Sequence, residues 1–230
     1  MNHSDIGQAI AVAARTIHHR HNLAETLQAI VDTASRSVPA FEHVGISTVT
    51  AAGEVATTAC TDDLVRRLDE VQYSLGDGPC FAALRDADLV VAPRLRHDQR
   101  WVQYVPYALE EGVRSQLAVK LYLDDEGTLG GINFYSTSTE EVDDDSRTLA
   151  QLFAAHAAIA LGHAHELDQL NEALCSRKVI GQALGILMER YQMDEDRAFA
   201  FLIRASSHGN VKLRRIAQEL VDQANRQQVG

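Results

Sequence analysis

The side chains in this sequence best suited to chemistry are cations and an amide in its last sixty residues. Six of them form two groups, one on the polar side of a predicted helix and one at the start of a later helix: Arg177, Lys178 and Gln182, then Lys212, Arg214 and Arg215. Such groups donate hydrogen bonds to phosphate oxygens and base edges. Ser206, Ser207 and His208, at the end of the helix between them, add further donors. A single charge is most simply a solvated surface residue, but the set favours a binding surface.

Two glycines lie one turn apart within the first of these helices, at Gly181 and Gly185. A glycine inside a helix costs about 1 kcal/mol relative to alanine, so a pair on one face indicates that something approaches the backbone closely. That partner is either a nucleic acid or a neighbouring helix, and helix physics alone favours neither.

Catalytic and metal-binding motifs are weak by comparison. The three cysteines, Cys60, Cys80 and Cys175, form no CxxC pair, and the sequence has no P-loop, GxSxG or HExxH motif. Cys80 follows a Gly-Asp-Gly-Pro turn at a predicted helix start, which can lower the pKa of a thiol, although a buried and inert cysteine is the simpler interpretation. The histidines of residues 18–21 point in different directions on a helix, which favours a surface over a metal site. We therefore predict no enzyme, metal or cofactor.

The first half of the chain predicts an α+β fold. Strands are indicated at 41–50, 55–60, 89–92, 115–123 and 129–135, and the helices between them at 62–70, 79–85 and 101–111. Strands come first, then a helical insertion, then a hairpin. This order favours an antiparallel sheet flanked by helices over a Rossmann-like alternation.

A long helix is predicted from Asp143, whose acidic start suits the helix dipole, to about Cys175. Apolar and small residues recur along it at alternating spacings of three and four, which is typical of a coiled-coil seam. The predicted dimerisation residues are Phe153, His156, Ala160, His163, Leu167, Leu170 and Leu174. His156 and His163 are either ordinary polar seam residues or a pH-sensitive register. The alternative is a helix that packs against its own domain.

Three amphipathic helices are predicted in the last sixty residues, enough for one small bundle. The first runs from Ser176 to Tyr191, Asp194 caps the second, and Asn210 caps the third after Gly209 ends the second. Their inward stripes are Val179, Ile180, Ala183, Leu184, Leu187 and Met188; Ala198, Phe199, Leu202 and Ile203; and Leu213, Ile216, Ala217, Leu220 and Val221. Tyr191 is the one candidate ring for stacking on a base.

Charge is divided unevenly along the chain. Residues 1–170 carry 12 Lys and Arg against 25 Asp and Glu, a net charge of −13, whereas residues 171–230 carry 9 against 7, or +2. The acidic part would repel polyanions and confine any contact with them to the C-terminal segment. Neither a membrane span nor a secretory signal is indicated, so we expect a cytoplasmic protein.

The C-terminal segment from Ser176 to about Asp222 resembles the ANTAR domain, a family of RNA-binding transcription antiterminators. The resemblance rests on SRKVIGQALGILM at 176–188, MDED at 193–196 with AF at 198–199, and KLR at 212–214 with IA at 216–217. The chain departs from the family at Leu184, where a lysine is usual. The resemblance implies RNA contacts by Arg177, Lys178, Gly181, Gln182, Gly185, Ser206, Ser207, Lys212, Arg214 and Arg215.

Residues from about Asn22 to His163 resemble a GAF domain of the kind that precedes ANTAR domains in actinobacteria. The resemblance rests on LDEVQYSLGDGPC at 68–80, RW at 100–101, GVRS at 112–115 and LGGINFY at 129–135. The resemblance implies a six-stranded sheet and a sensory role, with an unidentified small-molecule ligand or protein signal.

The expected domains are an N-terminal helix (1–21), a GAF sensor (22–143), a coiled-coil signalling helix (144–175), an ANTAR domain (176–222) and a tail (223–230). On this interpretation, a homodimer binds tandem RNA stem-loops in a nascent transcript and prevents a terminator from forming. Two alternatives remain. One is a DNA-binding factor with a helix-turn-helix-like C-terminal domain, and the other is an enzyme using thiol redox chemistry at Cys80.

Overall fold

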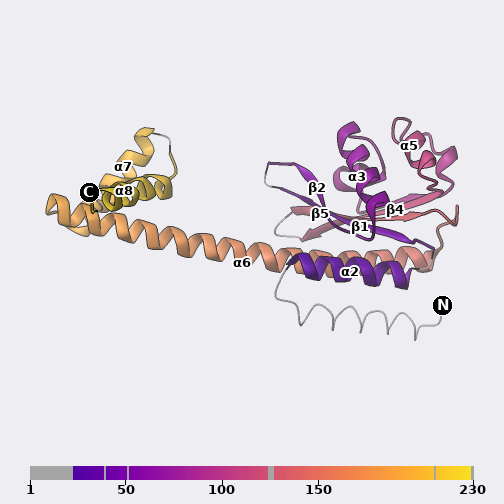
Figure 1. The fold of residues 1–230 in the computed structure, drawn as a ribbon, viewed down its shortest axis with the longest axis horizontal. Coiled ribbons are helices and arrows are strands. Elements are labelled where there is room, and N and C mark those ends of the chain that lie inside the picture. The colour runs from indigo at the N-terminus through magenta and orange to yellow at the C-terminus, as the bar shows by residue number, and fades with distance from the viewer. Residues whose placement is uncertain (1–22, 39, 51, 124–126, 210, 229–230) are drawn as a thin grey trace. The chain divides into compact units, whose positions relative to one another are not determined.

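The structure is a computed structural model that describes residues 23–38, 40–50, 52–123, 127–209 and 211–228. The predicted helix at 1–21, with its histidine cluster, and the predicted cap Asn210 lie outside these residues. The chain divides into two compact units, residues 1–164 and 165–230. One long helix, α6, contributes to both (Figure 1).

The first unit alternates short helices with strands much as the sequence predicts. Its elements, up to the long helix, are α2 (Leu23–Ser37), β1 (His43–Val49), β2 (Val55–Cys60), α3 (Asp63–Leu75), α4 (Pro79–Arg85), β3 (Leu89–Ala92), the 3-10 helix η1 (Leu95–His97), α5 (Val105–Glu110), β4 (Ser115–Leu123) and β5 (Gly127–Ser136). Every predicted strand forms, with ends that shift by one or two residues. The helix predicted at 101–111 is shorter, because regular α-helix begins only next to Pro106.

The strands form one antiparallel sheet in the order β2-β1-β5-β4-β3. Over the described residues the sheet has five strands, one fewer than the resemblance to a GAF domain implies. The α+β class is confirmed. The central strands β5 and β4 share the longest pairing, which runs from Ser115 opposite Ser136 to Leu123 opposite Gly127.

The two faces of the sheet bury different kinds of side chain. Helix α2 and the first part of α6 cover one face, and α3 and α5 cover the other (Figure 1). The first face is apolar, with Ile46, Phe134 and Phe153 fully buried in one cluster. The second face mixes apolar residues such as Leu68 with buried polar groups, because its strand positions include Asn133 and other polar residues.

Local capping explains where the helices around the second face begin and end. Asp62 accepts hydrogen bonds from the backbone of Leu64 and Val65 and so caps α3. Gly76 ends α3 in the left-handed conformation, with φ of 61°, which glycine adopts without strain. Pro79 then begins α4, as predicted.

Helix α6 runs without a break from Asp144 to Tyr191, a length of 48 residues. The two helices predicted at 143–175 and 176–191 are therefore one, and the predicted boundary at Ser176 is wrong. No glycine or proline lies between Gly162 and Gly181, so nothing in this stretch ends the helix. Asp143 caps its start by accepting a hydrogen bond from the backbone of Ser146 at 2.7 Å.

The second unit is a three-helix bundle made by the end of α6, α7 (Glu195–Gly209) and α8 (Leu213–Gln228). Asp194 caps α7 as predicted, accepting from the backbone of Arg197 at 2.9 Å. The bundle core consists of Ala183, Leu187, Ala198, Leu202, Ala217 and Val221.

Three predicted core residues of this bundle are substantially exposed: Met188 at 37%, Phe199 at 40% and Ile203 at 44%. The prediction for these three is wrong. Small alanines occupy the centre of the bundle, so the helices bury a narrower stripe than the predicted one.

Candidate nucleic-acid interface

One face of α6 in the second unit carries five of the predicted contact residues. Arg177, Lys178, Gly181, Gln182 and Gly185 are all exposed. Gly181 and Gly185 lie on the side of the helix opposite Ala183 and Leu187, which fill the bundle core. The structure therefore places two cations, an amide and bare backbone on one open stretch of helix.

The surroundings of the two glycines bear on why they are there. Apart from the nearby backbone of α6 itself, a Cβ atom added at Gly181 or at Gly185 would meet no described part of the chain within 4 Å. Close packing against a neighbouring helix of the same chain therefore does not account for either glycine. An approach by another molecule stays a prediction.

The remaining predicted contact residues lie on α7, on α8 and between them. Ser207 and Lys212 are exposed, as are Arg214 and Arg215. Arg215 forms an ion pair with Glu219, one turn along α8, at 3.3 Å. Ser206 is half-buried and donates to the carbonyl of Val211 at 2.6 Å, so its hydroxyl closes the α7–α8 connection.

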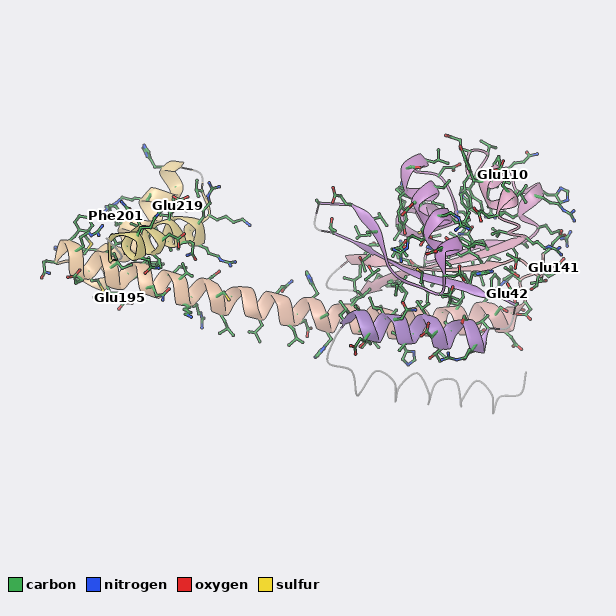
Figure 2. All side chains as sticks on the ribbon, in the orientation of Figure 1. Glu42, Glu110, Glu141, Glu195, Phe201 and Glu219 are labelled. Atoms are coloured by element: carbon green, nitrogen blue, oxygen red, sulfur yellow. The ribbon has the colours of Figure 1, made fainter. Side chains whose placement is uncertain are left out.

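Two exposed aromatic side chains on α7 were not predicted from the sequence. Phe201, labelled in Figure 2, is 40% exposed, as is Phe199. Residues 198–203 read Ala-Phe-Ala-Phe-Leu-Ile, and a helix cannot turn six successive apolar residues towards one core. That run was the available signal. Both rings are open to solvent, as is that of Tyr191, the one ring predicted for stacking.

A network of buried polar groups lies on the second face of the sheet in the first unit. The carboxylate of Asp69, fully buried on α3, accepts hydrogen bonds from Thr57 on β2 and from Asn133 and Tyr135 on β5. Gln72 joins the network by donating to Tyr135 at 2.9 Å. Burial raises the pKa of Asp69 to about 6, partly offset by these hydrogen bonds.

Cys80 also lies in this buried region, and its backbone N–H donates to the side chain of Gln72. Burial, with a further contribution from the charge of Asp69, raises the pKa of the Cys80 thiol to about 12. The thiol therefore stays protonated at neutral pH, which disfavours the thiolate chemistry of the redox alternative.

Among the described residues, no three His, Cys, Asp or Glu side chains lie together as metal ligands would. No helix within the described part of the chain is long and apolar enough to cross a membrane.

Comparison with known families divides the chain where the structure does. Residues 20–162 match the GAF domain, which is more than half of the chain, and residues 168–221 match the ANTAR domain.

This chain belongs to the GAF domain family.

Solved structures share the fold of its GAF domain. The GAF domain of a phosphoenolpyruvate-protein phosphotransferase from Coxiella burnetii aligns with a TM-score of 0.60 at 14% identity, over 74% of this chain and 99% of that one. The GAF domain of the corresponding Acinetobacter protein aligns with a TM-score of 0.56 at 12% sequence identity, again over 74% of this chain and 99% of that one. The chromophore-binding domain of a bacteriophytochrome from R. palustris aligns with a TM-score of 0.52 at 11% sequence identity, over 72% of this chain and 64% of that one. No curated protein matches the sequence. The actinobacterial likeness stays a prediction.

Leu184, where the resemblance to the ANTAR domain implies a lysine, is accommodated by the structure. Leu184 is half-buried and packs against the bundle core. A leucine at this edge position adds apolar contact there. The neighbouring cations Arg177 and Lys178 remain exposed on the helix.

The predicted seam falls into two parts along α6. Phe153 is buried in the GAF core and Ala160 packs against that core, so these residues contact their own domain. His156 donates to the carbonyl of Leu152 within the helix. Leu167, Leu170 and Leu174 are 48%, 58% and 55% exposed. The prediction that Phe153 belongs to the seam is therefore wrong. Of the predicted seam, three leucines ahead of the three-helix bundle form an exposed apolar stripe.

Proposed function

We propose that this protein is a signal-responsive RNA-binding regulator of transcription antitermination. Two copies pair through α6, and each ANTAR bundle holds one of two adjacent stem-loops in a nascent transcript. Holding both stem-loops keeps an overlapping terminator from forming. The GAF domain receives the signal. Because a regulator of a nascent transcript acts where transcription takes place, we expect the protein in the cytoplasm.

The observation that carries this proposal is the open glycine face of α6. Two helix-weakening glycines face empty space next to Arg177 and Lys178, within a segment that matches the ANTAR domain. Bare backbone admits a base or a phosphate at close range, and guanidinium groups bind phosphates with two hydrogen bonds. RNA loops suit this surface because their unstacked bases can be reached on their edges and faces.

The exposed leucine stripe supports pairing of two copies. Leu167, Leu170 and Leu174 follow the alternating spacing of a seam and remain half-exposed within one chain. Pairing two bundles makes the second binding step intramolecular, which raises the affinity for linked stem-loops without any new contact.

A gel-shift assay with the full chain tests the proposal against DNA binding. A hairpin-loop RNA and a DNA duplex of the same stem sequence are compared at equal salt. We expect the RNA hairpin to bind and the duplex DNA to bind at least tenfold more weakly. Preferential binding of the duplex would replace the proposal with the DNA-binding alternative.

A further inference from the structure

Arginines gather in the GAF domain where η1 meets the segment that leads into α6. Arg94 forms an ion pair with Glu141 at 3.0 Å, and Arg96 forms one with Glu140 at 2.6 Å. The backbone N–H of Arg94 also donates to the carbonyl of Glu140 at 2.8 Å. Glu141 is labelled in Figure 2.

A pocket of about 390 Å³ opens at this place. Its lining residues are Arg96, Leu109, Gly112, Val113, Arg114 and Glu140. This volume falls within the range of small-molecule sites, which run from roughly 300 to 1,000 Å³. Two guanidinium groups and one carboxylate give the lining a net positive charge, although the first 170 residues carry −13. Leu109 and Val113 add an apolar wall.

Arg114 has donors to spare within this pocket. Its hydrogen bond to the carbonyl of Ser138 is long, at 3.4 Å, and a guanidinium carries five N–H donors. Arg96 is held by Glu140, but both side chains of that pair reach solvent. Exposed ion pairs contribute little net stability, so a ligand anion can replace Glu140 on Arg96.

The backbone beside the pocket is strained. Arg94 has φ of 47° and ψ of 53°, a left-handed conformation that is costly for a residue with a Cβ atom. Such strain persists where the surrounding structure enforces it, and it concentrates at functional sites. Here the strained residue, Arg94, lies in the turn that begins η1, two residues before Arg96.

We propose that this arginine pocket binds a small organic anion. Arg96 and Arg114 hold the phosphate or carboxylate of the ligand, and Leu109 and Val113 contact its apolar part. Glu140 forms its ion pair with Arg96 when no ligand is bound, and so competes with the ligand for Arg96. Glu140 lies four residues before the start of α6, so binding would release a tether at the entrance to that helix. The proposal does not depend on RNA binding.

Titration calorimetry of the full chain with phenyl phosphate tests this proposal, with benzyl alcohol as the uncharged control. We expect phenyl phosphate to bind and benzyl alcohol not to bind. Arg114→Ala should weaken phenyl phosphate at least tenfold. Glu140→Gln removes the competing carboxylate and should tighten binding about fivefold, the equivalent of one exposed ion pair.

Arg67→Ala is the matched control, because Arg67 also forms an exposed arginine–glutamate pair, to Glu111, and does not line this pocket. It should leave the affinity unchanged. The proposal is overturned if phenyl phosphate does not bind, if benzyl alcohol binds equally well, or if Arg114→Ala and Arg67→Ala behave alike. It is also overturned if Glu140→Gln weakens binding. Glu140→Gln keeps the test valid even if Arg114→Ala unfolds the domain.

Discussion

The two glycines of α6 set stability and function against each other at single residues. Because a Cβ atom meets nothing at either position, alanine there should fit without strain. We expect Gly181→Ala and Gly185→Ala each to stabilise the second unit by about 0.5–1 kcal/mol. The same changes should weaken binding of hairpin RNA at least several-fold, because a methyl group separates the RNA from the backbone.

Urea unfolding followed by circular dichroism measures the stability change, and a gel shift measures the binding. The single tryptophan, Trp101, lies in the GAF core and reports unfolding of that unit separately. Ala173→Gly, at another exposed position of α6, is the control that should lose stability and keep RNA binding. A stabilised Gly181 variant with unchanged RNA affinity would remove the glycines from the interface.

Asp69 gives the GAF domain a distinctive dependence on pH. Its pKa is raised from the ordinary 3.8 to about 6 in the folded state, so the fold favours the protonated carboxyl. The folded state therefore holds more protons than the unfolded state between pH 4 and 6. The contribution of Asp69 to the free energy of unfolding should fall by about 2 kcal/mol as pH rises through this window, and level off above pH 7.

Comparison with Asp69→Asn isolates this effect, because other carboxyl groups, such as Asp62 and Asp98, have lowered pKa values and give slopes of opposite sign. Trp101 fluorescence during urea unfolding at pH 4 and pH 7 provides the free energies. Between pH 4 and pH 7, the free energy of unfolding of the variant should rise relative to that of the native protein by about 2 kcal/mol. Parallel stability profiles would show that Asp69 titrates normally.

At the scale of elements, sequence patterns located nearly every helix and strand of the first unit, because its turns carry strong local signals. Gly76, Gly78 and Pro79 set the α3–α4 turn, and the strands alternate visibly. The continuity of α6 was not predicted. The apolar pattern changes along the chain from a heptad seam to the stripe of a bundle helix, and such a change occurs either at a break between two helices or within one helix that buries different faces. Phe153 shows the same limit, because seam spacing cannot tell a partner helix from the chain's own sheet.

The sequence places the predicted contact residues only as far as one helix face. Exposure of Arg177, Lys178 and Gln182 follows from helical periodicity around Ala183. The bond from Ser206 to Val211 depends on how α7 turns into α8, and the exposure of Phe199 and Phe201 depends on the narrow core of the bundle. Both are tertiary properties that no local pattern fixes.

The leucine stripe of α6 yields a prediction about paired helices. Replacing both Leu167 and Leu170 by glutamate should split the dimer, because charges on a seam lose the apolar contact and repel across it. We expect tandem stem-loops to bind about 100-fold more weakly, and a single stem-loop to change by less than about threefold. Sedimentation velocity and gel shifts give the two readouts.

Gln169→Glu is the matched control, because Gln169 is exposed on the side of α6 opposite the stripe. It adds a charge to the same helix and should leave the dimer intact. An equal loss of affinity for single and tandem RNA in the Leu167 and Leu170 variant would contradict the avidity explanation.

At the scale of the whole molecule, the excess of acidic residues lies ahead of the last sixty residues. The first 170 residues carry −13 and the last sixty carry +2, so only the ANTAR end is suited to a polyanion. Binding should therefore involve few phosphates. The logarithm of the RNA affinity should fall with the logarithm of salt concentration at roughly −0.7 per phosphate neutralised on single strands. A slope near zero would argue against phosphate contacts.

The central claim is that a paired ANTAR surface selects looped RNA. The most direct measurement is fluorescence anisotropy of the full chain with a tandem stem-loop RNA, against an unpaired RNA of the same length and composition at physiological salt. We expect at least 100-fold tighter binding of the tandem stem-loop, with two copies of the chain on each RNA. Equal affinity for the two RNAs, or one copy on each, would contradict it.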